Sequence, residues 1–435
     1  MRIELISTGD ELLMGDITDT NASWLAQQLT EQGMKLSLKT TVGDNLDGLV
    51  DTFKQRSQQA DFIIVNGGLG PTSDDLSSEA AALALGEPVV MFEQWLEQMK
   101  AMFAKFNRTM TDSNLKQAML PQSAEIIDNP VGTACGFKIK LDKAVMVFTP
   151  GVPREFKTMV TEQILPLLSS LNDVEPLTIR RFLCMGIGES ALANLLQEVE
   201  LPDGCEFGYR AAMPFIEVKI FAANAQTLDP VIAQIETIVA KYCVVRDGNS
   251  LSRHVHQLLI ERAEEKSEQA DAFKFGTVES CTGGLVASSL VAFAGSSAYL
   301  DRGLVTYSNQ AKQDLANVSP AILDAFGAVS IEVAEEMAAG AVAAHNLNLA
   351  VSITGIAGPD GGSEEKPVGT VAFALADGQN CYSQMLFLPN RGRTSVQQTA
   401  VAIAQDMVRR YLTQQAVIGE YESYQCLSLG KKYHA

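Results

Sequence analysis

The residues best suited to covalent chemistry are a serine-rich turn and a lysine in the last third of the chain. Ser296 and Ser297 follow a glycine, and Tyr307 and Lys312 come within 15 residues of Ser297. A serine hydroxyl needs a base, and His345 is the only histidine in the central part of this region. A lysine can replace histidine when burial lowers its pKa. The grouping suggests Ser297 as nucleophile, Tyr307 as proton relay and Lys312 as base, although such a turn is more often a helix cap.

A glycine-rich segment near the start of the chain is the second group of residues suited to chemistry. Residues 66–75 read NGGLGPTSDD and lie between a strand-like and a helix-like stretch. Glycines such as Gly68 and Gly70 allow the backbone to approach a ligand closely. Thr72 can cap the following helix or donate a hydrogen bond to a phosphate. The segment therefore suggests a phosphate site, whereas the plainer interpretation is a glycine turn before a helix.

Asp74 and Asp75 are the last two residues of this segment. Carboxylates are compatible with a bound phosphate only if a divalent cation lies between them. Two other strand-like stretches also end in polar loops, at residues 8–11, which include Asp10, and at residues 149–155. Three such loops indicate one composite polar site with a bound cation. Each of these acids could instead cap a helix or lie on the solvated surface.

The elements that must position these residues alternate along the chain as strand, loop and helix. This order is typical of an α/β fold with a mostly parallel sheet and helices on both faces. Ligands then bind beyond the carboxyl ends of the strands. In the first part we expect strands at 3–7, 61–66 and 144–149, and helices at 21–31 and 77–85. In the last part we expect strands at 275–278, 304–306, 349–353 and 369–374, and helices at 251–266, 284–292, 331–345 and 394–412.

The changes of pattern divide the chain into domains. We expect an α/β domain over 1–170, a small α+β module over 175–246 and a second α/β domain over 250–413. The module contains three or four strands and two helices. Residues 414–435 have no clear period and are expected to form a loosely held tail.

Composition limits the classes of function. The chain has 33 Lys+Arg and 52 Asp+Glu, a net charge of −19, which argues against a surface that follows nucleic-acid phosphates. The apolar runs have the length of strands, so no membrane segment is expected. Seven scattered cysteines without a CxxC pair indicate reduced thiols and a cytoplasmic protein, and four histidines argue against a histidine-rich metal site.

The three strand-end loops of the first domain resemble the molybdopterin-binding fold of the MoaB/MogA type. Asn114, Lys116 and Gln117, together with residues 129–134, extend the resemblance to the competence/damage-inducible CinA family. The resemblance implies a metal-dependent ADP-ribose pyrophosphatase, which releases AMP and ribose 5-phosphate. The expected cation is Mg, Mn or Co. Asp74, Asp75 and, less strongly, Asp10 with Glu11 are the expected metal ligands, and Gly68, Gly70, Thr72 and Lys116 are the expected substrate contacts.

The last domain is similar to the NMN deamidase (PncC-type) domain that ends CinA proteins. The similarity rests on the ESCTGG motif at 279–284 and on the run SITGIAGPDGGSEEKPVGTV at 352–371. It implies that Ser297 attacks the nicotinamide carboxamide, that Lys312 is the base and that Tyr307 assists. Ammonia leaves an acyl-enzyme, which water hydrolyses to nicotinate mononucleotide without a cofactor. Backbone N–H groups at the serine turn would stabilise the oxyanion.

The resemblance also assigns substrate contacts to Ser280, Thr354, Gly355 and one arginine. The family commonly carries two arginines near its end, where this chain reads NRGRTSVQ at 390–397. Arg393 fits the spacing of the first arginine, Arg391 is its rival, and Gln397 replaces the second.

The expected partners are therefore small nucleotides, NMN and ADP-ribose, in a homodimer that binds neither nucleic acid nor membrane directly. Two alternatives remain open. The first domain could bind a pterin or nucleotide without hydrolysing it, or the chain could be an interaction protein in competence or DNA damage.

Overall fold

The chain folds into two compact units, Met1–Thr178 and Ile179–Ala435, and each is described by itself. The computed structural model describes residues 1–172, 175–248, 250–267, 272–389, 391–430 and 433–434. No helix in those ranges is both long enough and apolar enough to cross a membrane. The expected α+β module and last domain share one unit, because the apolar side chains of Leu183 and Met185 join the core of the last domain.

The first unit is built on a six-stranded sheet in the order β2-β1-β3-β8-β7-β6. Its strands are β1 (Ile3–Thr8), β2 (Leu36–Val42), β3 (Phe62–Asn66), β6 (Glu125–Ile127), β7 (Gly136–Leu141) and β8 (Ala144–Thr149). The four strands β2, β1, β3 and β8 are parallel neighbours, and β7 and β6 continue the sheet antiparallel. The loops after β1, β3 and β8 therefore meet at one edge, as the sequence predicts.

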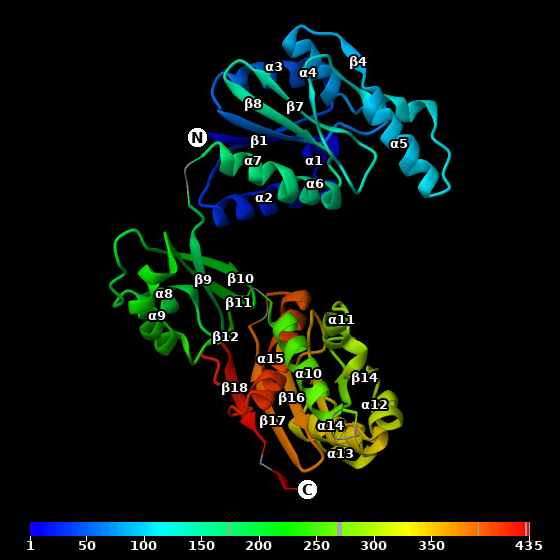
Figure 1. The fold of residues 1–435 in the computed structure, drawn as a ribbon. Helices are drawn as coiled ribbons and strands as arrows, with labels where there is room; N and C mark the ends of the chain where they lie inside the picture. Colours follow the sequence, from blue (N-terminus) through cyan, green and yellow to red (C-terminus); the bar gives the residue numbers. More distant parts are fainter. Residues whose placement is uncertain (173–174, 249, 268–271, 390, 431–432, 435) are drawn as a thin grey trace. The chain divides into compact units, whose positions relative to one another are not determined.

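Helices cover both faces of this sheet (Figure 1). One face carries α3 (Leu46–Ser57), α4 (Ser77–Leu85) and α5 (Glu93–Lys105), and the other carries α2 (Thr20–Glu31), α6 (Pro153–Met159) and α7 (Leu165–Ser170). The remaining elements are α1 (Asp10–Met14), β4 (Val89–Met91) paired with β5 (Met119–Pro121), η1 (Asp112–Ala118) and η2 (Val160–Ile164). Helix α2 begins one residue before its predicted start, because the side chain of Asp19 caps it by accepting a hydrogen bond from Ala22 N.

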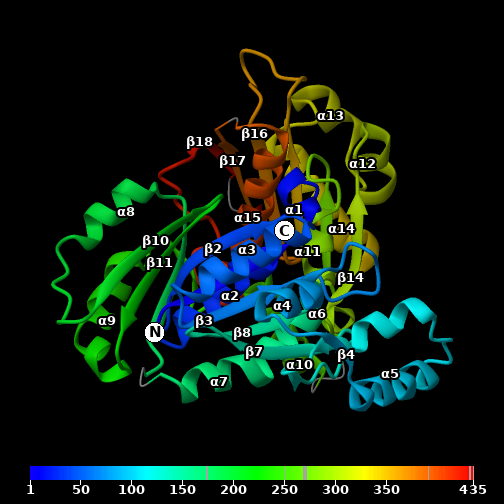
Figure 2. The ribbon, with the colours of Figure 1, turned by 90° about the horizontal axis from the view of Figure 1, so that it is seen from above.

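The second unit begins with a four-stranded sheet in the order β10-β11-β9-β12. Its elements are β9 (Thr178–Met185), α8 (Glu189–Leu196), β10 (Glu206–Ala212), β11 (Phe215–Ala222), α9 (Ala225–Val239) and β12 (Cys243–Arg246). Helices α8 and α9 pack on one face of this sheet (Figures 1 and 2). The four strands and two helices agree with the α+β pattern of the sequence.

The last sheet has the order β14-β13-β15-β16-β17-β18, with β19 paired to β17. Its strands are β13 (Phe275–Glu279), β14 (Leu300–Val305), β15 (Leu349–Gly355), β16 (Thr370–Ala376), β17 (Asn380–Phe387), β18 (Gln425–Leu429) and β19 (Tyr433–His434). Strand β13 runs parallel to both β14 and β15, and the other pairs are antiparallel. The carboxyl ends of β13, β14 and β15 therefore share one edge.

Two helical layers enclose this sheet. One layer contains α10 (Leu251–Ser267), α11 (Leu285–Val291) and α15 (Arg393–Leu412), and the other contains α12 (Asn309–Ala316), α13 (Pro320–Phe326) and α14 (Ile331–His345). The turn η3 (Ser296–Ala298) precedes β14.

For residues 414–430, which the structure describes, the expectation of a loosely held tail is wrong. Val417 and Tyr421 are buried in the core of the second unit, and β18 adds a strand to β17. The Tyr421 hydroxyl donates to Asp406 Oδ2 at 2.8 Å. The segment is held by single buried side chains and by strand pairing, neither of which produces a periodic pattern.

Candidate active sites

A buried lysine and a serine form the centre of the second unit's candidate site. Lys312 lies on α12 and is 1% exposed, and its Nζ donates to Ser280 Oγ at 3.1 Å. The same amine donates to Thr306 O at 2.8 Å and lies 3.5 Å from Tyr307 O. Ser280 directly follows β13, and Thr306 directly follows β14. The pair therefore sits at the shared carboxyl edge, where ligands of such sheets bind.

Burial changes the chemistry of this lysine. Desolvation by burial lowers the pKa of Lys312 below that of an ordinary lysine. Its hydrogen bonds in the described structure go to uncharged oxygens. A neutral amine beside a serine hydroxyl can accept the hydroxyl proton, which is how a serine becomes a nucleophile.

The structure does not form the expected pair of Ser297 and Lys312. Ser297 lies in η3, before the first residue of β14, whereas Lys312 contacts residues that follow the last residue of β14. Six strand residues separate the two positions, or about 20 Å at about 3.3 Å per residue. Ser297 is exposed at the amino edge of the sheet, so within one chain neither it nor its turn lies beside Lys312. Ser280, expected only as a substrate contact, is the serine that lies beside Lys312.

Tyr307 does not connect the serine and the lysine either. Its ring is 63% exposed, and its hydroxyl lies 3.5 Å from an Nη of Arg393. The other Nη of Arg393 donates to Gly358 O at 2.8 Å. Tyr307 and Arg393 thus form an exposed, cationic rim near the buried Lys312. Arg391 instead reaches Met213 Sδ in the β10–β11 turn at 3.7 Å, which favours Arg393 as the arginine of this site.

The predicted substrate contacts Thr354 and Gly355 end β15 at the same edge. The Thr354 hydroxyl donates to Ala328 O at 2.6 Å, so its lone pairs remain as acceptors. A Cβ on Gly355 would lie 2.8 Å from a methyl of Val371 and 2.9 Å from Thr370 O. Gly355 is therefore required by close packing of β15 on β16, which is a structural reason for the glycine.

The loop that carries Ser280, residues 280–284, is held from two sides. The carboxylate of Glu279 is fully buried and accepts hydrogen bonds from the N–H groups of Gly284, Val286 and Ala287 at 3.0 Å. On the other side, Gln397 Nε2 donates to Cys281 O at 2.8 Å. Gln397 therefore supports the loop, where the family pattern has a second arginine. Burial raises the pKa of the Cys281 thiol to about 12, which keeps it protonated beside the serine.

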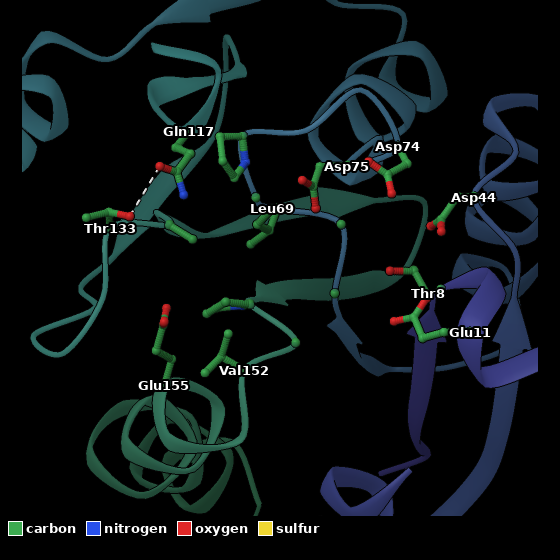
Figure 3. Close-up of a pocket in the computed structure, with 18 residues that line it drawn as sticks. Thr8, Glu11, Asp44, Leu69, Asp74, Asp75, Gln117, Thr133, Val152 and Glu155 are labelled. Carbon is green, nitrogen blue, oxygen red and sulfur yellow. Dashed lines mark hydrogen bonds between the residues drawn. The ribbon is translucent and has the colours of Figure 1, made fainter. Parts of the chain in front are cut away.

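The first unit has its own cavity of about 380 Å³ at the carboxyl ends of β1, β3 and β8 (Figure 3). The glycine segment 67–70 forms one wall, and residues 150–152 face it across the cavity. A Cβ on Gly70 would collide with Asp75 Oδ2, so a side chain here would displace that carboxylate from its observed position. Two buried atoms at this edge, Thr8 Oγ1 and Asn21 Oδ1, have no hydrogen-bond partner in the described structure. A ligand would satisfy such atoms.

Four carboxylates line this cavity on the side of the glycine wall. Glu11 and Asp44 lie near Thr8, and Asp74 and Asp75 lie across from them (Figure 3). Burial and the negative charges of Asp10, Glu11 and Asp74 raise the pKa of Asp44. No set of three His, Cys, Asp or Glu side chains among the described residues is already gathered around one point. A cation here would need substrate oxygens to complete its coordination, as Mg²⁺ usually does.

Three other predicted residues have local roles. The carboxylate of Asp10 accepts from Asp44 N at 3.1 Å, and Asp10 is not among the residues that line the cavity. Thr72 is exposed and donates to Asp75 Oδ2 from both its N–H and its hydroxyl. Lys116 donates to Thr72 O and lines a neighbouring cavity of about 250 Å³ that also borders Gly68 and Gly70. Asp44 replaces Asp10 as the acid that faces the main cavity.

The sequence analysis missed Asp44, Glu279 and Gln397 as site residues. Asp44 follows β2, whose polar sequence LSLKTTV does not resemble a buried strand. The sequence therefore does not indicate that Asp44 lies at the end of a strand. Glu279 precedes a helix start, where an acid cap is a recognisable signal. Gln397 meets Cys281 across 116 residues of chain, and no local pattern indicates that contact.

Comparison with known proteins agrees with this architecture. The family described as "Probable molybdopterin binding domain" matches residues 4–170, and the "CinA C-terminal domain" family matches residues 257–412. The CinA-like protein of Shewanella woodyi is 52% identical over 429 residues, which cover 98% of this chain and 99% of that protein. The CinA-like protein of Shewanella loihica is 51% identical over 428 residues, with 98% and 99% covered.

Solved structures match parts of the chain. The competence/damage inducible protein CihA from Agrobacterium tumefaciens is 42% identical, and the match covers 37% of this chain and 96% of that one with a TM-score of 0.34. The protein CinA from Thermoplasma acidophilum is 30% identical, with 38% and 97% covered and a TM-score of 0.36. With two family domains in order and relatives about half identical over nearly its whole length, the chain belongs to the CinA family.

Proposed function

We propose that the C-terminal domain is a serine amidohydrolase that converts nicotinamide mononucleotide (NMN) to nicotinate mononucleotide and ammonia. The observation that carries this proposal is the 3.1 Å contact between the buried amine of Lys312 and Ser280 Oγ. The domain is of the NMN deamidase type, and this family relation supplies the substrate. The same contact supports Ser280, in place of Ser297, as the nucleophile of this proposal.

The chemistry follows from the two side chains. Neutral Lys312 takes the hydroxyl proton as Ser280 Oγ bonds to the carboxamide carbon. The protonated amine then returns that proton to the leaving nitrogen, and ammonia departs from an acyl-enzyme. Water attacks the acyl carbon with Lys312 again as base, which releases the nicotinate product and the Ser280 hydroxyl. Arg393 and Tyr307, at the exposed rim, are placed to hold the phosphate and the sugar outside the buried pair.

Ammonia release from NMN in the presence of EDTA tests this proposal. Ser280→Ala should abolish release, because the nucleophile is removed. Ser297→Ala is the matched control and should retain wild-type rates, because Ser297 lies at the opposite edge of the sheet. Loss of release in Ser297→Ala with retention in Ser280→Ala would refute the assignment. No release from folded wild type would refute the deamidase itself.

We further propose that the first unit hydrolyses ADP-ribose to AMP and ribose 5-phosphate with a divalent cation. The glycine wall, the carboxylates and the unsatisfied atoms Thr8 Oγ1 and Asn21 Oδ1 support a site for a polar, phosphate-bearing ligand. The carboxylates of Asp74, Asp75, Glu11 and Asp44 fit a hard cation, which would neutralise pyrophosphate charge and activate water when bound. In this proposal the diphosphate binds against the backbone at Gly68 and Gly70.

AMP release from ADP-ribose tests this second proposal. Added Mg²⁺ should support turnover, EDTA should remove it, and Asp75→Asn should lower it. Asp51→Asn is the matched control, because Asp51 is an exposed acid of α3 that does not line the cavity. If ADP-ribose binds with equal affinity to wild type and Asp75→Asn, and neither hydrolyses it, the unit is a binding module. We also propose a homodimer, which sedimentation equilibrium would test.

A further inference from the structure

The loop that carries Ser280 contains a buried threonine, Thr282, whose hydroxyl and backbone N–H have no hydrogen-bond partner among the described residues. Thr282 is 1% exposed and lies two residues after Ser280. Its Oγ1 has no hydrogen-bond partner, and no hydrogen bond from its backbone N–H is formed within the described residues. A buried hydroxyl without a partner is rare in folded proteins and costs stability, so a second role is the usual reason for keeping one.

Three other N–H groups of this loop are used within the protein, whereas that of Cys281, like that of Thr282, forms no hydrogen bond to another described residue. Ser280 N–H donates to Ile353 O at 2.9 Å, and Gly283 N–H donates to Ser280 O at 3.1 Å. Gly284 N–H donates to the carboxylate of Glu279. Gly283 and Gly284 adopt φ of 63° and 98°, which curls the backbone around Glu279. The loop is therefore held by its neighbours, and Thr282 combines a buried hydroxyl and a backbone N–H that both have no partner among the described residues.

Attack of Ser280 on a carboxamide creates a negatively charged oxygen close to the nucleophile. Such an oxygen is stabilised by preorganised donors in a site shielded from water, and buried donors on a rigid loop meet both conditions. We infer that Thr282 is the oxyanion-binding residue of the deamidase, through its hydroxyl and its backbone N–H. This inference rests on the proposed deamidase function and replaces the serine turn at 296–297 as the source of the oxyanion donors.

Among the described residues of this unit, Thr370 is the other threonine with a buried hydroxyl that lacks a partner, and its position excludes it from the same role. Its Oγ1 is also buried without a partner among the described residues. It lies on β16, which is separated from β13 by β15. Two strand spacings amount to about 10 Å, so Thr370 is remote from the strand that ends at Ser280.

Replacement of Thr282 by valine tests the inference because the two side chains share a shape. Loss of one oxyanion donor should lower kcat for NMN about 100-fold, while KM should change less than about threefold because the donor acts in the transition state. Thr282→Val should also raise Tm by about 2–4 °C, because an unsatisfied hydroxyl is removed from the interior. Thr282→Ser should restore most of kcat. A purely structural role would lower kcat and Tm together.

Thr413→Val is the matched control. Its hydroxyl already donates to Arg409 O at 2.9 Å at the end of α15, so this variant should keep kcat and should not gain stability. An active wild type with an equally active Thr282→Val overturns the inference alone. A fall in both kcat and Tm in Thr282→Val also overturns it. A folded wild type that releases no ammonia overturns the proposed function, and the inference falls with it.

Discussion

Lys312 gives the sharpest prediction, because its burial and its contacts together determine its chemistry. Lys312→Met removes the amine but keeps an unbranched apolar stem in a position that is 1% exposed. A positioned general base contributes about 10²- to 10⁴-fold to rate, so kcat/KM for NMN should fall by at least about 100-fold. That loss corresponds to about 2.7 kcal/mol of transition-state stabilisation at about 1.36 kcal/mol per tenfold.

The burial of Lys312 also predicts the direction in which kcat/KM changes with pH. Lys312 must be neutral to accept the proton from Ser280, so kcat/KM should rise with pH and level off above the pKa of Lys312. Burial lowers that pKa, so the rise should be centred below the value of about 10.4 of an ordinary lysine. Lys312→Arg keeps a positive charge that cannot be lost, and it should be inactive at every pH.

Stability should follow the same titration. The pKa of Lys312 is lower in the folded state than in the unfolded state, so the unfolded chain binds more protons between those two values. Wild-type stability should therefore increase as pH rises from the folded pKa toward about 10.4, by about 1.4 kcal/mol for each unit that separates them. Lys312→Met should lack this increase.

Initial rates of ammonia release between pH 6 and 10, together with urea unfolding over the same range, are the assays. A Lys312→Met variant within threefold of wild type would refute the base assignment. A rate profile centred at or above the pKa of an ordinary lysine would contradict the effect of burial. Equal pH dependence of stability in wild type and Lys312→Met would show that a group other than Lys312 causes the change in stability.

The other predictions concern the rim, the loop support and the tail. Arg393→Ala should raise KM for NMN about 10- to 100-fold by loss of a charged hydrogen bond, whereas Arg391→Ala, the matched control, should not; equal effects would contradict the placement of Arg393 at the site. Gln397→Leu should lower kcat more than it raises KM, because it frees the Ser280 loop; a pure KM effect in steady-state kinetics would assign it to phosphate binding. Tyr421→Phe should lower the free energy of unfolding by about 1–3 kcal/mol in urea, because Asp406 loses a buried donor; an unchanged midpoint would argue against that contact.

Elements with local signals could be predicted from the sequence. Helix α14 was predicted over its observed range because it begins and ends with recognisable caps. The Ser330 hydroxyl accepts from Val333 N, and Asn346 ends the helix at a φ of 52°. Strand β14 was expected only at 304–306, because its first half, 300–303, contains two charged residues and a glycine. Pairing with β13, and not its own sequence, makes that half a strand.

In the candidate sites, too, some features follow from the local sequence and others depend on contacts between residues that are far apart in the chain. The three strand-end loops of the first unit share an edge because their strands are parallel neighbours, which the alternation of elements already implies. Ser280 and Lys312 are 32 residues apart, and their contact depends on which end of β14 each one follows. Sequence spacing favoured Ser297 because it is closer to Lys312 along the chain, whereas the strand places it at the far edge. Sheet topology therefore determines which serine lies beside Lys312 within the chain.

The most direct test of this account is to locate the acyl group on the protein. Wild type quenched during turnover of NMN, digested and analysed by mass spectrometry should carry the nicotinoyl adduct on the peptide that contains Ser280. Ser280→Ala should show no adduct, and Ser297→Ala should show the wild-type pattern. An adduct on the peptide that contains Ser297, with none on Ser280, would contradict the central claim that Lys312 activates Ser280.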